Sequence, residues 1–419
     1  MLSSTITKEK ILSLAMFMLL PILACAQLSV NGEFRPRTEL RDGYRILNTS
    51  QSDPAFFTSQ RTRLILHYTT DAYTFKLSAQ DVRTWGEVSQ LGDTPNVNIH
   101  EAWAQLNLSE MTQLQLGRQE LIYDDQRLLG SVNWAQQARS HDALRFKYRN
   151  GDTDFSLDIG AAYNQAGQNL QGNNYPLNNY KVLSYLWLNK DFGDVDLSAL
   201  VLTDGFQSGA DEVNYRYTYG THVNYKASDE LDFSGTFYLQ SGDDATRTDI
   251  SAFMAAAGAT YKLEDVTLSG GIDYLSGGEA GDSNPAQGAF STLYATNHKF
   301  YGNMDYFINV PVDALSGGLQ DIYLKAVFTT SEDANVSVAY HNFASANALA
   351  DPANAGETLD KALASEIDAA FTYKIEKDVT FKIGYSVLFS SSTLETVQNR
   401  QADGLQQWAW AMLVITPNF

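Results

Sequence analysis

The sequence predicts an all-β protein, a transmembrane antiparallel β-barrel of about 18 strands with short periplasmic turns and long extracellular loops. Three observations predict it. Apolar and polar residues alternate along most of the chain, the connections are short and long in turn, and an aromatic residue ends an amphipathic final segment. Together they favour a closed sheet in a bilayer over a soluble sandwich, whose strands are usually shorter.

The alternation has a period of two, which is the period of a β-strand. In the segment 28–41 apolar residues hold most even positions and polar residues the odd ones, and 154–163 alternates in the same way. Most such segments run about 10–15 residues, which is long enough to cross a bilayer at a tilt. The expected strands are 28–41, 55–69, 72–84, 98–108, 112–120, 142–149, 153–164, 180–191, 195–204, 213–227, 230–241, 250–263, 266–276, 319–330, 334–344, 363–375, 379–390 and 406–419.

The connections support the count of eighteen. Short ones, such as 70–71, alternate with long polar stretches such as 42–54 and 122–140. Outer-membrane barrels have this arrangement of short periplasmic turns and long external loops. The segment 298–312 also looks like a strand, but a nineteenth strand would make the number odd and break the alternation. We therefore assign it to a long loop, 277–318, that could fold into the lumen.

The first 26 residues predict a secretory signal peptide that precedes a barrel of residues 27–419. A basic start and an apolar stretch, 11–24, precede Ala24-Cys25-Ala26, which fits the small-x-small cleavage pattern. Lipidation at Cys25 is the alternative at the same boundary. Cys25 is the only cysteine, so we expect no disulfide in the mature chain. A signal peptide followed by a barrel predicts a bacterial outer membrane, with lipid and lipopolysaccharide as surroundings.

The C-terminal segment is the most specific single signal. Trp408, Trp410 and Met412 alternate with other apolar residues, and the chain ends at Phe419. A terminal aromatic residue on such a strand resembles the signal read by the outer-membrane barrel assembly machinery, so we expect this machinery as a partner. The last strand must then pair with the first to close the barrel.

The arginines are concentrated early in the chain, where twelve of fifteen precede residue 151. Rows of basic residues share the polar side of a strand: Arg35, Arg37 and Arg41 in the first, Arg61 and Arg63 in the second, Arg145, Lys147 and Arg149 in the sixth. A charge facing lipid at the bilayer centre costs roughly 2–4 kcal/mol, so these rows are expected to face the lumen. Guanidinium groups bind carboxylates well, and such a ladder suits the passage of anionic solutes.

The alternative is that these arginines pair with carboxylates inside the barrel. Residues 27–150 contain fourteen basic and fourteen acidic residues, and Glu33 and Glu39 interleave with the first row. The net charge of −20 argues against nucleic acid as a partner. Much of it comes from residues 151–419, whose acids predict a solvated external face or, alternatively, divalent-cation binding among lipopolysaccharide or polysaccharide carboxylates.

The sequence does not predict an enzyme, a cofactor or a metal site. The six histidines are dispersed without metal-binding spacing, and neither a GxSxG turn nor a phosphate-binding glycine loop is present. The weaker alternative is a hydrolase that uses His67 or His341, with its other residues on separate strands.

The stretch Leu116–Tyr148 resembles the signature region of the alginate export porin family. The resemblance is carried by Gly117-Arg118-Gln119-Glu120, Asp125-Gln126-Arg127-Leu128, Gly130, Trp134, Arg139 and Asp142. The segment 297–302 is similar to a second family motif. The resemblance implies an 18-stranded outer-membrane barrel whose arginine-rich constriction passes an anionic polysaccharide. The resemblance implies one of two roles for four residues of this stretch: they clamp a loop inward, or they contact the solute. These residues are Arg118, Arg127, Arg139 and Asp142, and both roles stay open. Only three arginines follow residue 150, so a lumen positive on all sides is not expected.

We therefore expect an outer-membrane porin or exporter for anionic solutes, such as an acidic oligo- or polysaccharide like alginate. The alternatives are a general diffusion porin with little preference and a structural or adhesive barrel plugged by its loops. The residues expected along the solute path are Arg35, Arg37, Arg61, Arg63, Arg118, Arg127, Arg139, Arg145, Lys147, Arg149 and Asp142.

Overall fold

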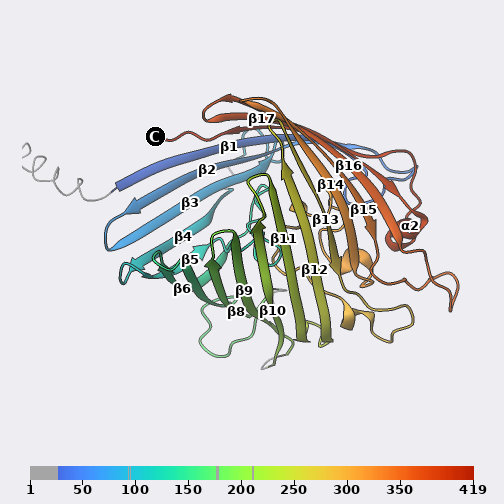
Figure 1. Cartoon of the computed structure of the whole chain (residues 1–419), viewed down its shortest axis with the longest axis horizontal. Helices are drawn as coiled ribbons and strands as arrows, with labels where there is room; N and C mark the ends of the chain where they lie inside the picture. Colours follow the sequence, from blue (N-terminus) through green and yellow to red (C-terminus); the bar gives the residue numbers. More distant parts are fainter. Residues whose placement is uncertain (1–26, 93, 95, 176–178, 210–211) are drawn as a thin grey trace, which may run out of the picture.

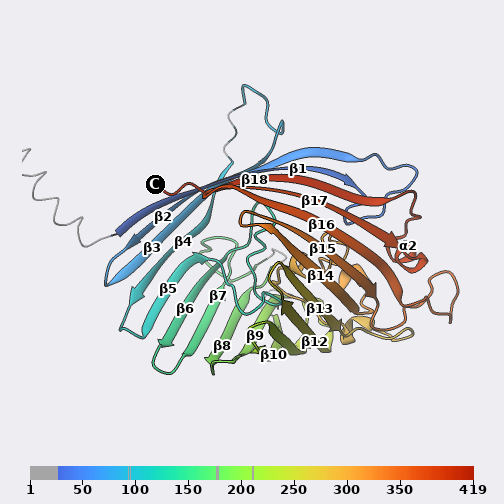
Figure 2. The ribbon, with the colours of Figure 1, turned by 45° about the horizontal axis from the view of Figure 1, so that its top comes forward.

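The computed structural model describes residues 27–419 except 93, 95, 176–178 and 210–211, so the expected signal peptide and Cys25 lie outside the described residues. Eighteen antiparallel strands form one sheet in which sequence neighbours pair and the first strand pairs with the last. Figure 1 shows the barrel, and Figure 2 shows strand β18 lying between β1 and β17. The predicted 18-stranded antiparallel barrel is confirmed.

The strand bounds follow the alternating segments of the sequence closely. They are β1 (Gln27–Asp42), β2 (Ala55–Thr69), β3 (Tyr73–Thr84), β4 (Val97–Asn107), β5 (Thr112–Gln119), β6 (His141–Asn150), β7 (Phe155–Tyr163), β8 (Val182–Asp191), β9 (Val195–Gln207), β10 (Val213–Lys226), β11 (Leu231–Asp243), β12 (Asp249–Lys262), β13 (Val266–Leu275), β14 (Leu319–Ser331), β15 (Ala334–Ala344), β16 (Ala362–Glu376), β17 (Val379–Ser390) and β18 (Gln406–Ile415).

The last strand is shorter than its sequence predicts, because it ends at Ile415. Pro417 has no N–H group to donate to a sheet ladder. The tail instead continues beside β1, where Gly32 N donates to Pro417 O (2.8 Å) and Phe419 N donates to Val30 O (3.0 Å). The aromatic C-terminus is thus held by its backbone, while its ring is exposed.

The two faces of the sheet differ in polarity, as the alternation requires. On β1 the odd-numbered side chains point inward, and Arg35, Arg37 and Glu39 are buried there. The even-numbered Leu28 and Leu40 are exposed on the outer face. Large exposed apolar side chains recur around the other strands, so the barrel turns an apolar surface outward.

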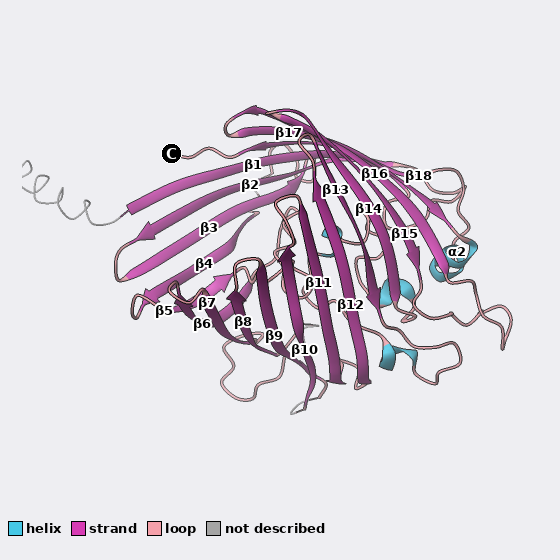
Figure 3. Cartoon of the chain, viewed as in Figure 1, coloured by secondary structure: helices cyan, strands magenta, loops and turns pink. Residues whose placement is uncertain are grey.

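Among the residues that the structure describes, helical structure lies only in long connections (Figure 3). The short helix α2 (Ser392–Gln398) lies between β17 and β18 and begins after Ser391, whose side chain accepts a hydrogen bond from Leu394 N. Three short 3₁₀ segments lie between β13 and β14: η1 (Pro285–Gly288), η2 (Asn297–Lys299) and η3 (Val312–Ala314). No helix among the described residues is both long and apolar enough to cross a membrane.

Two long connections fold into the barrel. We call residues 120–140, between β5 and β6, the first lumen loop, and residues 276–318, between β13 and β14, the second lumen loop. Phe290 and Phe307 of the second lumen loop are fully buried, and the hydrophobic core lies between these loops and the inner wall. The strand-like segment 298–312 forms turns and 3₁₀ structure rather than a strand.

Candidate functional site

The first lumen loop is held to two separate strands of the inner wall, β7 and β13. Tyr123 OH donates to Asp158 Oδ2 on β7 (2.7 Å). Arg127 donates to both carboxylate oxygens of Asp273 on β13, at 2.5 and 3.0 Å. Burial alone would lower the pKa of Arg127, but Asp273 and Asp125 hold it above its ordinary value. Arg127 is therefore a clamp on the loop.

The wall formed by β1 and β2 holds the same loop through its arginines. Arg35 Nε donates to Gln136 Oε1 (3.0 Å), and Arg37 Nη1 donates to Trp134 O (2.9 Å). Arg61, which is fully buried, donates from Nη1 to Gln136 O (3.1 Å). These arginines lie on the inner wall as expected, but their donors fix the position of a loop.

Carboxylates also pair with the arginines of this wall. Glu39 Oε1 lies 2.9 Å from Arg37 Nε. Glu33 Oε1 lies 2.6 Å from Arg61 Nη2 and 3.8 Å from Arg35 Nε. Charge-assisted hydrogen bonds of this kind are stronger than neutral ones. Structural pairing, the alternative left open by the sequence, thus accounts for Arg37 and Arg61.

The two lumen loops are joined to each other by backbone hydrogen bonds. Leu129 and Tyr294 form a parallel β-bridge. Gly130 N donates to Tyr294 O (2.9 Å), and Thr296 N donates to Gln126 O (3.0 Å). The loops therefore form one partition inside the barrel, which we call the lumen partition.

An aromatic cluster joins the lumen partition to the barrel seam. The Trp134 ring stacks on His298 at 4.5 Å between centroids and meets the Trp410 ring edge-on at 5.0 Å. The Arg37 guanidinium lies 4.3 Å from the centre of the same indole. His298 Nδ1 lies 2.7 Å from Asp305 Oδ1. The side chain of Trp134 is therefore packed between the second lumen loop and β18.

The second lumen loop docks on the wall through both backbone and side-chain hydrogen bonds. Met304 N donates to Glu366 Oε1 on β16 (2.8 Å), and Tyr306 OH donates to Gly43 O (2.5 Å). Gly302 has a φ of +75°, and a Cβ there would lie 2.6 Å from Glu366 Oε2. Only glycine fits this close approach without strain.

Substitution Gly302→Val is expected to undock the second lumen loop, because it adds both backbone strain and a collision with Glu366. The expected result is a larger and noisier single-channel conductance in planar bilayers. Gly281→Val is the matched control, since Gly281 has a φ of +96° in the same loop but nothing within 4 Å of its Cβ position. Equal conductance of the two variants would show that the docked backbone does not limit the pore.

The docked loop covers a group of inner-wall acids that sequence analysis assigned to no site. Asp321, Glu366 and Asp368 are buried on β14 and β16. His341 Nδ1 lies 2.8 Å from Asp321 Oδ2, and His341 Nε2 lies 4.0 Å from Asp368 Oδ2. All four residues have the inward parity of their strands, and this parity is the signal that could have identified the three acids.

Three expected lumen cations have no carboxylate within ion-pair distance among the described residues. Arg63 Nη2 donates to Gln80 Oε1 (2.7 Å), and Lys147 Nζ donates to Gln105 Oε1 (2.9 Å). Arg139 Nη1 donates to a backbone carbonyl of the second lumen loop (3.1 Å). Their hydrogen-bond partners are neutral, so none of these three charges is compensated by a direct ion pair.

The environment of Arg139 differs from that of Arg127. Burial lowers the pKa of the Arg139 guanidinium, with Tyr294 and Tyr180 opposing the effect. The lowered pKa means that the protonated form lacks full compensation. An anion beside Arg139 would supply it.

The β6 row is also short of negative charge. Arg145 Nε and Arg149 Nη1 share one carboxylate, Asp158, at 3.1 and 2.6 Å. Lys147 lies between them in the same row. Three cations therefore face one acid on this part of the wall.

Arg118 and Asp142, which were expected along the solute path, do not reach the lumen. They have the parity of Leu116 and Leu144, which are exposed on the outer face. Arg118 Nη1 lies 3.1 Å from Asp142 Oδ2, and the two side chains are 41% and 65% exposed. They join β5 to β6 beside the first lumen loop, at strand ends where outward charge is penalised little. The two side chains therefore face away from the lumen and join the two strands of the β5–β6 hairpin.

A cavity of about 720 Å³ lies on the long-loop side of the lumen partition. Its walls are the ends of β1 to β3 and both lumen loops. Arg37, Arg41, Arg45 and Arg139 line it, and Glu39 is among the acids there. We call this cavity the arginine vestibule.

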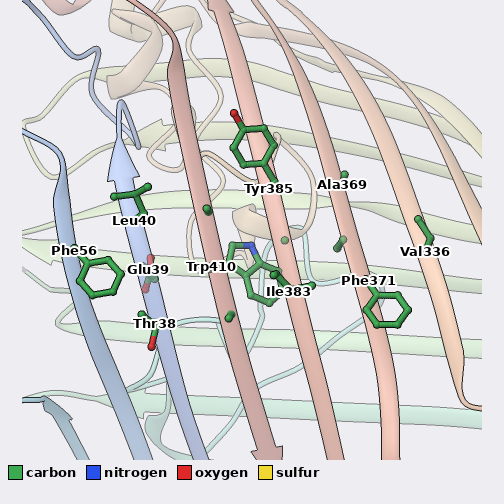
Figure 4. Close-up of a pocket in the computed structure, with 14 residues that line it drawn as sticks. Thr38, Glu39, Leu40, Phe56, Val336, Ala369, Phe371, Ile383, Tyr385 and Trp410 are labelled. Atoms are coloured by element: carbon green, nitrogen blue, oxygen red, sulfur yellow. The ribbon is translucent and has the colours of Figure 1, made fainter.

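An apolar groove of about 560 Å³ lies on the outer side of the seam. Figure 4 shows Phe56, Phe371 and Tyr385 projecting around it from separate strands. Small residues such as Ala409 and Ala411 form its floor on β18. Because their parity is outward, this groove belongs to the lipid-facing surface and not to the solute path.

Known structures share this architecture. Acinetobacter baumannii OccAB4 is 12% identical with a TM-score of 0.63, covering 94% of this chain and 98% of that one. Pseudomonas aeruginosa OccK9 (OpdG) is 12% identical with a TM-score of 0.65, covering 94% and 99%. P. aeruginosa OpdK, crystallised with vanillate, is 12% identical with a TM-score of 0.64 and the same coverage. At this identity the likeness concerns the fold.

The sequence itself matches one family. No match was found among curated proteins. The model of the alginate export family matches residues 26–406, which span almost the whole described barrel. Together with the 18-stranded fold, this match shows that the chain belongs to the alginate export family and is a porin of the bacterial outer membrane.

Proposed function

We propose that this porin passes anionic solutes, and that acidic oligo- or polysaccharides such as alginate are the class it serves. The observation that carries the proposal is the set of cations without carboxylate partners, Arg63, Arg139 and Lys147. Positive charge that lacks an ion-pair partner, in a narrow passage of low dielectric constant, attracts anions and repels cations. The family to which the chain belongs supports the same solute class.

The acids of the inner wall offset this positive charge only in part, because they are buried or paired. Glu366 and Asp368 are buried beneath the docked second lumen loop. Asp204 is buried and paired with Arg216 at 2.6 Å. A solute in the lumen therefore meets the half-buried β6 row and the arginines that line the vestibule more directly than these acids.

In this proposal the arginine vestibule receives or releases the solute, and the lumen partition is the constriction. Arg35, Arg37 and Arg61 act on the solute indirectly, because they set where the partition stands. Arg139 is placed to act directly, since it lines the vestibule and belongs to the partition. We propose no enzymatic activity. Recognition of the C-terminal strand by the barrel assembly machinery stays a prediction.

Reversal potentials in planar bilayers under a KCl gradient test the proposal. The native channel is expected to prefer chloride, and alginate fragments should block it where neutral oligosaccharides of equal length do not. Joint substitution of Arg63, Arg139 and Lys147 by glutamine should reduce both effects, because it removes the charges that lack an ion-pair partner. Joint substitution of the outer-face pair, Arg118→Gln and Asp142→Asn, is the control and should change neither.

A native preference for potassium would overturn the proposal. Equal block by charged and neutral sugars would instead identify a general diffusion porin. A second candidate, a barrel plugged by its loops, is favoured by the hydrogen bonds that unite the two loops. That candidate expects no native conductance and a pore that opens when residues 277–318 are deleted.

A further inference from the structure

Three side chains able to bind a metal ion meet inside the barrel, where β4 and β5 lie side by side (Figure 2). They are His100 and Glu101 on β4 and Glu120, the first residue of the first lumen loop. Their possible ligand atoms all lie within 4.8 Å of one another. His100 is 3% exposed and Glu101 6% exposed, so neither is an ordinary surface group. Imidazole nitrogen and carboxylate oxygen are common ligands of divalent transition metals.

A β-bulge creates this grouping. Ser78 pairs with Glu101, but the next residue, Ala79, pairs with Ile99, so His100 is the extra residue on β4. Successive side chains of a regular strand point to opposite faces. Here His100 and Glu101 are consecutive and both buried, while Ile99 is exposed outside. Bulges of this kind re-aim a side chain and are frequent beside functional sites.

A buried hydroxyl beside the group is without a partner. Ser78 is fully buried, and its Oγ has no hydrogen-bond partner among the described residues. It lies directly across the β3–β4 pair from Glu101 on the same inward face, where opposite Cβ atoms are roughly 4.5–5.5 Å apart. Buried polar atoms are normally satisfied, so this one points to a ligand.

The charges already present define the kind of ion. His100 Nε2 lies 2.8 Å from Glu120 Oε1, and Lys76 pairs with Glu101. Arg61 and Arg63 are close enough to interact with Glu120. This basic surrounding disfavours ions held by charge alone, such as Ca²⁺ or Mg²⁺. It leaves ions that gain from the bond to imidazole, such as Zn²⁺.

We propose that His100, Glu101 and Glu120 bind a divalent transition-metal ion of the Zn²⁺ type, with the Ser78 hydroxyl as a further donor. The ion takes the place of the Lys76 ammonium beside Glu101 and enters between His100 and Glu120. Because Glu120 begins the first lumen loop, the ion ties the base of that loop to β4. The porin thus contains a metal-dependent anchor for its lumen partition. This role is separate from the class of solute that the porin passes.

Calorimetric titration of EDTA-treated barrel in detergent with ZnCl₂ tests this site without any solute. One Zn²⁺ per barrel is expected, with Ca²⁺ producing no comparable binding. His100→Asn and Glu120→Gln should each weaken Zn²⁺ binding at least roughly tenfold. Lys76→Met should strengthen it, because the competing ammonium is removed. His222→Asn, at a buried histidine that contacts Thr236 on another wall, is the matched control.

Zn²⁺ binding unchanged by both His100→Asn and Glu120→Gln would overturn the proposal, as would the absence of stoichiometric binding. Heat-modifiable migration of each variant on gels reports that its barrel is folded. A shift of the melting temperature on adding Zn²⁺ gives a second readout that a folded but metal-free site cannot produce. Neither result depends on ion selectivity, so failure here is distinct from failure of the proposed solute class.

Discussion

Replacing residues 122–138 of the first lumen loop with a short Gly-Ser linker is expected to raise single-channel conductance by on the order of threefold or more. Without this loop the partition is lost, and an 18-stranded barrel encloses an aqueous channel. The barrel itself should survive, because Gln119 pairs with His141 and a short turn can join β5 to β6. Conductance in planar bilayers and heat-modifiable migration measure the two effects.

Trimming the exposed stretch 352–356 in the β15–β16 connection is the control for this deletion. Its residues are exposed, so conductance should not change. An unchanged conductance after the lumen deletion would show that the constriction lies elsewhere. A pore that is silent in the native protein and opens in the variant would favour the plugged barrel over a porin that is open at rest.

Substitution Arg127→Met is expected to destabilise the barrel by about 3–5 kcal/mol, the usual cost of leaving a buried charge unpaired. Arg127 is clamped by Asp273 and Asp125, and the methionine leaves both carboxylates without their cation. Replacing both ends, Arg127→Met with Asp273→Leu, should recover most of the loss, since a buried ion pair is often replaceable by apolar residues. Denaturant unfolding in detergent measures each variant.

The Arg118–Asp142 pair on the outer face is the matched comparison for the Arg127–Asp273 pair, because it consists of the same two residue types. Arg118→Met breaks an Arg–Asp contact of 3.1 Å, but exposed pairs are worth less than about 1 kcal/mol. If Arg118→Met lowered the free energy of unfolding as much as Arg127→Met, the structural distinction between the two pairs would be contradicted. If both substitutions lowered the free energy of unfolding only slightly, the contact of Arg127 with Asp273 would not contribute to the stability of the barrel.

Strand number and the lumen-facing rows were predictable because lipid imposes a simple rule on each strand. Alternation with period two separates the faces, and charge is excluded from the apolar one. The same rule applied to Arg118 places it with Leu114 and Leu116, which is the outer face. Its assignment to the lumen came from family resemblance instead, and parity was the better guide.

The partners of the ladder arginines were not predictable, since loops have no repeating pattern. The first lumen loop contains four non-glycine residues with positive φ, Asp124, Gln126, Val132 and Ala138, a conformation that sequence seldom reveals. Its backbone carbonyls, which any residue could supply, take the guanidinium donors. The His100 bulge was hidden for a related reason, because one extra residue breaks the alternation that would have located it.

The contacts of the first lumen loop also bear on how the barrel is built. Arg35 meets Gln136 across 101 residues of sequence, and Arg127 meets Asp273 across 146. The loop therefore needs both an early strand, β1, and a late one, β13, before its anchors are complete. A sheet that lacks either of these strands cannot hold the lumen partition in place. During biogenesis, the lumen partition can therefore reach its final position only after most of the barrel wall has formed.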